Sequence, residues 1–312
     1  TCSSHPMEFG AHLLLALIEG DVGAAVLSLT AVGLGLVFGV MRVVNVAHGE
    51  FFMLGAVFAW FIATSIGGHR ALGFIAAVLI APLITGVIAS LADMTVLKRI
   101  DYDPERTIVA TIGLLYIIQQ ATLMTYGPEA RAVEPPFNHR IAIPWYDSTA
   151  GEWFYPWGLS VTSYKLFVIG AAVAILLGVW VLMSRTKIGL LMRATQLDRD
   201  MATAFGIPVE KVYAIVFGIG AGLAALAAVL IVPISQAHYL MGGDPLLLSF
   251  IVVIIGGLGS LPGAVVAALL IGMSDGIISV FFSPTLAKII ATLLVALVLV
   301  FRPQGLFGAK AA

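Results

Sequence analysis

The chain has 312 residues, a formal net charge of −1, and a composition that is 60% hydrophobic and only 11% charged. Charged residues make up roughly a quarter of a soluble domain, so the composition excludes an ordinary soluble fold, and the small net charge provides no attraction for nucleic acid. The single cysteine, Cys2, excludes a disulfide framework and a thiolate metal cluster.

Apolar runs recur along the chain, which predicts an all-α, polytopic helical membrane protein with a single domain, residues 1–312. The first run, residues 9–18, has the length of a signal-peptide core. It has no Lys or Arg before it and no clear cleavage site after it, so we expect it to be retained. It either lies at the membrane interface or forms an early turn of the first span, interrupted at Glu19-Gly20-Asp21.

The remaining runs predict membrane segments at residues 22–40, 49–67, 71–97, 107–126, 164–184, 212–237, 246–258, 263–282 and 286–301. A helix needs about 20 residues to cross the hydrocarbon core, so the run 246–258 is too short to cross comfortably. A re-entrant or broken helix is tolerated only where its backbone faces protein or a cavity. We therefore expect eight or nine membrane segments.

Basic residues cluster in three of the connecting segments, which all fall on one side if every segment crosses. They are Lys98, Arg99 and Arg106; Arg185, Lys187, Arg193, Arg199 and Lys211; and Arg302 and Lys310 in the tail. Because short loops rich in Lys and Arg stay in the cytoplasm, this side is predicted to be cytoplasmic. The loop 127–163 and the N-terminus are then expected outside.

An internal repeat is a further hypothesis. Residues 48–63 and 258–273 both pass from a polar, glycine-containing break into an apolar helix that opens with Gly-Ala. The predicted orientation makes these two helices parallel, as in some transporters. The alternative is that Gly-Ala pairs are frequent wherever membrane helices pack tightly.

The break between the first two long runs contains the polar residues Arg42, Asn45, His48 and Glu50. Such groups are costly at membrane depth and usually face a bundle interior or a water-filled cavity, which predicts a gate or hinge. The alternative is a solvated turn that caps the next helix. His48 has no second histidine at helical spacing, so we do not expect a metal site.

Four further residues are candidates for the substrate pathway. Gly256, Gly257 and Gly259 belong to a glycine-rich turn that no lysine follows, which favours a hinge or a close-packed turn over a phosphate loop. Asp275 interrupts an apolar run and is a candidate by default, although it can equally lie at the interface.

Four stretches together resemble the LivH-type permeases, the membrane subunits of branched-chain amino acid ABC importers. They are residues 32–56, 186–212, 251–272 and 301–308. The resemblance covers nearly the whole chain except the outer loop. It implies a multi-pass permease of the bacterial inner membrane that imports branched-chain or related amino acids.

The resemblance also implies partners: a second related permease subunit, two ABC ATPases, and an extracytoplasmic solute-binding protein. The chain has no Gly-Lys dipeptide and therefore no P-loop. We expect it to be a transport subunit without enzyme activity or cofactor of its own. ATP and magnesium would bind to the ATPase subunits.

By the same resemblance, residues 185–211 are expected to be a cytoplasmic coupling segment that docks on an ATPase. Residues 195–205 are predicted to form one helix with a small apolar face and a charged rim, ended by Gly206. The expected coupling residues are Arg193, Ala194, Asp198, Arg199, Met201, Ala204, Phe205 and Gly206. The alternative is an ordinary amphipathic helix at the interface.

Two other functions stay open. Related permeases serve urea or short amides, and the sequence does not fix the cargo. A stand-alone, ion-coupled transporter or channel would instead place His48, Glu50 and Asp275 in an ion path, and co-purification with an ATPase would distinguish the two. Neither a zinc-protease nor a GxSxG motif is present, which disfavours an intramembrane enzyme.

Overall fold

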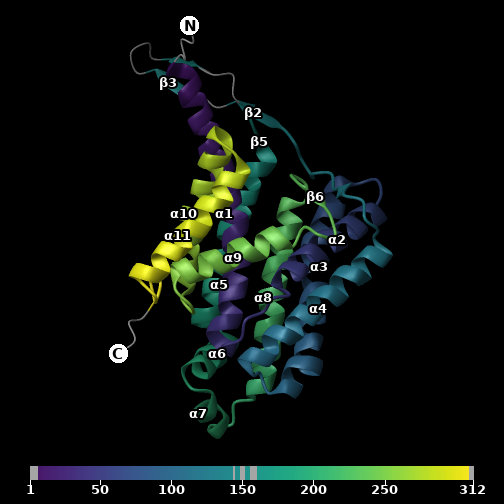
Figure 1. The fold of residues 1–312 in the computed structure, drawn as a ribbon. Helices are drawn as coiled ribbons and strands as arrows, with labels where there is room; N and C mark the ends of the chain where they lie inside the picture. The colour runs from purple at the N-terminus through teal and green to yellow at the C-terminus, as the bar shows by residue number, and fades with distance from the viewer. Residues whose placement is uncertain (1–5, 143–144, 148–151, 155–159, 309–312) are drawn as a thin grey trace.

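The computed structural model describes residues 6–142, 145–147, 152–154 and 160–308, which excludes Cys2 and Lys310. This part of the chain folds into eleven α-helices joined by turns and very short strands (Figure 1). Seven of the described helices are long and apolar enough to cross a membrane. The prediction of an all-α membrane protein is therefore confirmed at the level of fold class.

The helices are α1 (Pro6–Met41), α2 (His48–Ser65), α3 (Arg70–Ala92), α4 (Pro104–Thr125), α5 (Ser163–Arg185), α6 (Lys187–Leu197), α7 (Arg199–Ala204), α8 (Val209–Ile231), α9 (Gly243–Gly256), α10 (Leu261–Phe281) and α11 (Pro284–Phe301). A π-helical turn, η1 (Asp93–Leu97), and a 3-10 turn, η2 (Lys98–Ile100), prolong α3. Each of the nine predicted segments corresponds to one helix. Their boundaries differ most at two places.

The first difference is that α1 runs through Glu19-Gly20-Asp21 without a break, so the predicted interruption is wrong. Gly20 lies where α1 meets α10, and a Cβ there would be 3.1 Å from the Cα of Met273. The glycine therefore allows the two helices to approach. Glu19 forms an ion pair with Lys165 of α5, so this acidic residue has a partner within the helix bundle.

The second difference is that α8 ends at Ile231 rather than at residue 237. Pro233 follows the C-cap residue Val232, and proline lacks the amide hydrogen that a continuing helix requires. Strand β6 (Gln236–Ala237) then pairs with β1 (Arg131–Ala132). The strands β2 (Arg140–Ala142), β3 (Trp145–Asp147), β4 (Glu152–Phe154) and β5 (Ser160–Thr162) belong to the predicted outer loop, and parts of that loop lie outside the described residues.

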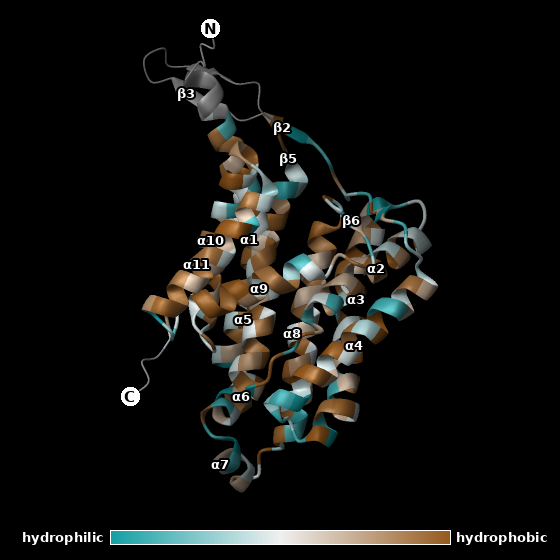
Figure 2. Ribbon diagram, in the orientation of Figure 1, coloured by the Kyte–Doolittle hydropathy of each residue, from teal (hydrophilic) through white to brown (hydrophobic). Residues whose placement is uncertain are grey.

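Helix α1 is the axis of the bundle, with α10 and α8 packed along it and α9 crossing the middle of the molecule (Figure 1). Helices α6 and α7 form the lower end, and the short strands lie at the upper end. Hydrophobic residues dominate the helices between these ends, whereas hydrophilic residues gather at both ends (Figure 2). This distribution matches the requirement of a protein that crosses a bilayer.

Close glycine contacts join several helix pairs, so the Gly-Ala pairs of residues 48–63 and 258–273 are weak evidence for an internal repeat. Gly33 of α1 and Gly220 of α8 face one another, since a Cβ on Gly33 would lie 2.5 Å from the Gly220 carbonyl oxygen. Helix α10 begins beside Gly39 near the lower end of α1, whereas α2 begins at the middle of the molecule. The two echoed segments therefore do not occupy equivalent places.

The pair Glu19–Lys165 provides a stability prediction for the α1–α5 contact. Lys165→Met should lower the thermal midpoint in detergent, because it leaves a half-buried carboxylate unpaired, at a cost of about 1–3 kcal/mol. Glu19→Gln/Lys165→Met should recover most of that loss. If the double variant melts as low as the Lys165→Met protein, the pair does not join the two helices.

Candidate functional site

The chain turns back on itself after α1. Residues 42–47 are not helical, and α2 begins part-way along α1 rather than at its end. The Nε2 atom of His48, the first residue of α2, lies 2.8 Å from the carbonyl oxygen of Thr30. Thr30 is about 16 Å along α1 from Met41, at 1.5 Å per residue. Six extended residues reach about 20 Å, which is enough to cover that distance.

Three polar side chains of this break are buried. Asn45 is 1% exposed, His48 0% and Glu50 4%. Their burial agrees with the expectation that they face the interior, although their role as a gate stays a prediction. Arg42 is exposed and has a φ of 57°, so it does not belong to the buried group.

Buried polar atoms of the break are only partly hydrogen-bonded. The carbonyl oxygen of Thr30 can only accept, so Nε2 of His48 carries the proton of this bond. Within the described part of the chain, Nδ2 of Asn45, Nδ1 of His48 and Oε2 of Glu50 have no partner. Each orphaned group costs about 1–3 kcal/mol. A turn with a purely structural role would not require three such groups.

The backbone of the break is held from two sides. The amide of Ala47 donates to Oδ1 of Asn45 at 3.0 Å, and the amide of Val46 donates to Oγ1 of Thr111 at 3.2 Å. Thr111 lies on α4 and is fully buried. These bonds satisfy amides that the absence of helix would leave unpaired.

The starts of α2 and α9 meet at two glycines. A Cβ on Gly49 would collide with the carbonyl oxygen of Gly242, and a Cβ on Gly242 would collide with that of Gly49. No larger residue fits at either position. Two helix N-termini, each carrying partial positive charge, therefore converge at the centre of the molecule.

A cavity of about 380 Å³ opens beside this junction. Its walls come from α1, α2, the end of α8 and the start of α9, and they are mainly apolar, with Phe52 and Leu248 among them. Thr30, Gln236 and Asp244 supply polar groups. The carbonyl oxygen of Thr30 also accepts the hydrogen bond from His48. Thr30 therefore connects the cavity wall to the first residue of α2.

The remaining pathway candidates lie away from the break. Asp275 is half-buried in α10, within electrostatic range of the ion pair between Lys288 and Asp244, whose atoms are 2.8 Å apart. Gly256 packs against Gly263 at the start of α10.

The glycine-rich turn at the end of α9 is closed by the C-terminal tail. The amides of Leu306 and Phe307 donate to the last carbonyl groups of α9. Gly257 has a φ of 101°, and a Cβ there would lie 2.6 Å from the amide nitrogen of Gly308. These contacts place Gly257 in a close-packed turn beside the tail. Gly259 lies beside Gly39 at the end of α1.

The charged segment 185–211 forms two helices, so the predicted single helix over 195–205 is wrong. Asp198 separates α6 from α7 because its backbone is extended and its side chain caps α7, accepting from the amides of Asp200 and Met201. Gly206, with a φ of 83°, ends α7 as predicted.

An exposed apolar patch covers the tip of this segment. Leu197 is 87% exposed, Met201 53% and Phe205 80%, and Ala204 is also exposed. Asp198, Asp200, Arg193 and Ala194 lie beside it along the chain. A cluster of large exposed apolar side chains in a polar surrounding is typical of a binding surface.

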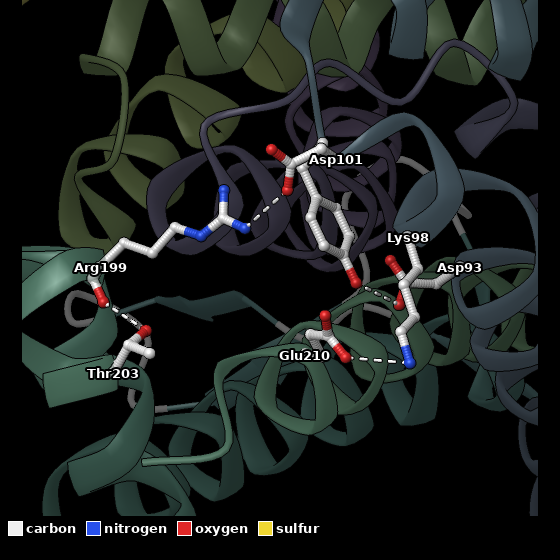
Figure 3. Close-up of polar contacts among 7 residues, drawn as sticks. Asp93, Lys98, Asp101, Arg199, Thr203 and Glu210 are labelled. Carbon is white, nitrogen blue, oxygen red and sulfur yellow. Dashed lines mark hydrogen bonds and ion pairs between the residues drawn. The ribbon is translucent and has the colours of Figure 1, made fainter. Parts of the chain in front are cut away.

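Arg199 lies differently from its neighbours. Its guanidinium points toward the turn between α3 and α4 and forms an ion pair with Asp101, 3.1 Å away (Figure 3). Lys98 similarly reaches Glu210 at 2.9 Å. The predicted basic loop 98–106 and the charged segment are thus joined at the same end of the molecule.

Sequence patterns did not reveal several residues of this site. Thr30 and Thr111 are single hydroxyl residues inside apolar runs, where most threonines bond to their own helix. Gly242 is part of a Gly-Gly pair, which indicates a turn but not its contact. No sequence pattern pointed to Asp101 or Tyr102.

Comparisons with known proteins agree on one family. The family model described as branched-chain amino acid transport system, permease component, matches residues 17–299. The chain is 27% identical over 308 residues to the high-affinity branched-chain amino acid transport system permease protein BraD of Pseudomonas aeruginosa, covering 95% of this chain and 96% of BraD. It is 25% identical over 315 residues to the permease protein LivH of Escherichia coli, with the same two coverages.

Among solved structures, PsaBC from Streptococcus pneumoniae in complex with Fab is similar, with a TM-score of 0.53 and 14% identity. The likeness covers 95% of this chain and 96% of that chain. At this identity it concerns the fold alone.

The junction of α2 and α9 yields a prediction with an adjacent control. Gly242→Ala should destabilise the protein by about 1–3 kcal/mol through overpacking, since the new methyl group meets the backbone of Gly49. Gly243→Ala should change stability by less than about 0.5 kcal/mol, because nothing lies within 4 Å of its Cβ position. Thermal unfolding in detergent measures both, and equal midpoints would contradict the close contact.

Proposed function

The chain belongs to the family of branched-chain amino acid transport system permease components, and we propose that its buried break is the gate of alternating access. It is a multi-pass membrane permease of a bacterial ABC importer and not an enzyme. Its place in a multi-subunit system implies ATPase and binding-protein partners. The observation that carries the gate proposal is the partly unpaired, buried group Asn45, His48 and Glu50, of which His48 is bonded to Thr30 in the cavity wall.

The lower end, with α6 and α7, is proposed to be cytoplasmic. The ion pairs Arg199–Asp101 and Lys98–Glu210 bring two basic segments together there, and the tail joins them through the contact of Gly308 with Gly257. The strand-bearing upper end then faces the soluble binding protein. The positive-inside rule supports this orientation.

Nine passages are proposed, two of which combine a helix with a non-helical segment. Residues 42–47 and α2 together make one passage, and residues 232–242 and α9 make another. In each case a long helix, α1 or α8, is followed by a return to the middle of the molecule. The two units run in opposite directions (Figure 1), which favours an inverted repeat over the parallel one suggested by the sequence echo.

The cavity beside the break suits an amino acid with an aliphatic side chain. Val26, Leu27, Met241 and Leu248 provide apolar walls, and Asp244 supplies a carboxylate at one edge. Apolar burial stabilises such a side chain by about 1.5–3 kcal/mol. Urea and short amides would gain little from these walls, which supports branched-chain amino acids as cargo.

The assembly is proposed to contain a second related permease subunit and two ATPases that bind ATP and magnesium. The patch of Leu197, Met201, Ala204 and Phe205 would dock in a groove of one ATPase. Closure of the ATPase pair would move α6 and α7, and the starts of α2 and α9 would then open the path to one side or the other.

Phe205→Asp should abolish co-purification of the ATPase, because an exposed apolar anchor contributes about 2 kcal/mol or more to an interface. The matched control is Phe282→Asp, since Phe282 is 74% exposed but lies at the far end of α10. The control variant should retain the ATPase. Wild-type co-purification by the Phe205→Asp protein would rule out docking through this patch.

Glu50→Gln tests the gate. The change preserves the shape of a buried side chain whose Oε2 has no partner among the described residues, so the folded yield should be unchanged. Uptake into proteoliposomes should be largely lost if the charge takes part in switching. Wild-type uptake would instead assign residues 42–50 to a structural turn.

A further inference from the structure

The turn between α3 and α4 is clamped to α7 and α8 by two ion pairs. Asp101 accepts from Arg199 at 3.1 Å, and Lys98 lies 2.9 Å from Glu210 (Figure 3). Arg199 therefore has its charged partner within this chain, although it belongs to the segment expected to contact the ATPase.

Two tyrosines support the guanidinium of Arg199. It lies 5.5 Å from the ring centroids of both Tyr102 and Tyr213, within cation–π range. The two rings meet edge to face with centroids 4.7 Å apart. Burial, reinforced by the nearby Asp93 carboxyl, raises the pKa of Tyr102 above its ordinary value. The Tyr102 hydroxyl donates to Asp93 at 3.4 Å.

The turn also has an unusual backbone. Among the described residues other than glycine, positive φ occurs only at Arg42, Asp101 and Tyr102, at 57°, 54° and 54°. Residues other than glycine, Asn and Asp rarely adopt this conformation, and such strain persists only where surrounding contacts impose it. Asp101 tolerates this conformation, whereas for Tyr102 the ring contacts with Tyr213 and Arg199 supply those contacts.

Helix α4 connects this clamp to the gate. Asp103 caps its start by accepting from the amides of Glu105 and Arg106, and two turns later Oγ1 of Thr111 accepts from the amide of Val46 in the break. Much of the remaining surface of α4 is exposed: Val109 is 71% exposed, Ile117 66% and Met124 85%. The helix is thus a stiff element attached near one end to the clamp and further along to the break.

We propose that α4 transmits the movement of α7 to the break at residues 42–47, with Arg199 and Thr111 as positioning residues at its two joints. This inference rests on the proposed function. It gives Arg199 a role different from the sequence-based expectation: Arg199 fixes α4 to α7 rather than binding the ATPase. Loss of either joint should therefore uncouple ATP hydrolysis from transport while leaving the complex assembled.

A charge exchange tests the first joint in the assembled importer. Arg199→Asp and Asp101→Arg should each raise the ATP hydrolysed per solute imported about threefold or more. The double variant Arg199→Asp/Asp101→Arg should restore much of the wild-type ratio, because the ion pair is rebuilt in reverse. No restoration, or normal coupling in the Asp101→Arg protein, would overturn the role of this pair.

Thr111→Val tests the second joint, because valine keeps the shape but offers no acceptor to Val46. The ATP cost per solute should rise, and Thr111→Ser should preserve the wild-type ratio. Thr125→Val is the control, since its hydroxyl bonds only within α4, to Ala121 and Thr122. Normal coupling in the Thr111→Val protein would overturn α4 as the connection.

ATPase co-purification separates these outcomes from failure of the proposed function. The clamp variants are expected to retain the ATPase, whereas the Phe205→Asp protein is expected to lose it. Loss of the ATPase from the Arg199→Asp and double variants alike, with retention by the Asp101→Arg protein, would assign Arg199 to the docking surface and contradict the clamp.

Discussion

Backbone amides and carbonyls cannot be left unpaired in hydrocarbon, and this constraint decides where the chain can interrupt its helices. The interruption at residues 42–47 lies inside the protein, where Thr111 pairs with the amide of Val46. The interruption after α8 is paired differently, by the contact of β6 with β1 and by the hydroxyl of Tyr126, which donates to Ala237 at 2.6 Å. Two breaks become tolerable because other elements enclose them.

Enclosed breaks allow two helices to begin at the centre of the molecule rather than at its surface. Gly49 and Gly242 allow the starts of these two helices to touch. The hydrogen bond from His48 to Thr30 fixes the position of α2 along α1. The polar groups of the proposed gate are therefore buried where elements with few alternative positions meet. In the proposed mechanism, a small shift at this junction would change which side of the membrane the adjacent cavity faces.

Sequence patterns predicted the helices well because an apolar run of sufficient length has few alternatives in a membrane protein. They failed where a local sequence feature is accommodated by contacts with residues far away in the sequence. Glu19-Gly20-Asp21 suggested a break, but α10 accommodates the glycine and Lys165 pairs with the acid. The separation of α6 and α7 at Asp198 was not predicted, because an aspartate that caps a helix resembles a solvated residue when it occurs in a helical pattern. The sequence showed that residues 42–50 are rich in polar side chains. It did not show how far into the helix bundle these residues lie.

The most direct test of the gate is the accessibility of the break from the two sides of the membrane. A single cysteine placed at Val44, in a chain with Cys2→Ser, would be challenged with an impermeant thiol reagent in proteoliposomes containing the whole importer. The cysteine should react from one side without nucleotide and from the opposite side when ATP and vanadate trap the closed ATPase pair. Reaction from the same side in both states, or from neither side in either state, would contradict alternating access at this break.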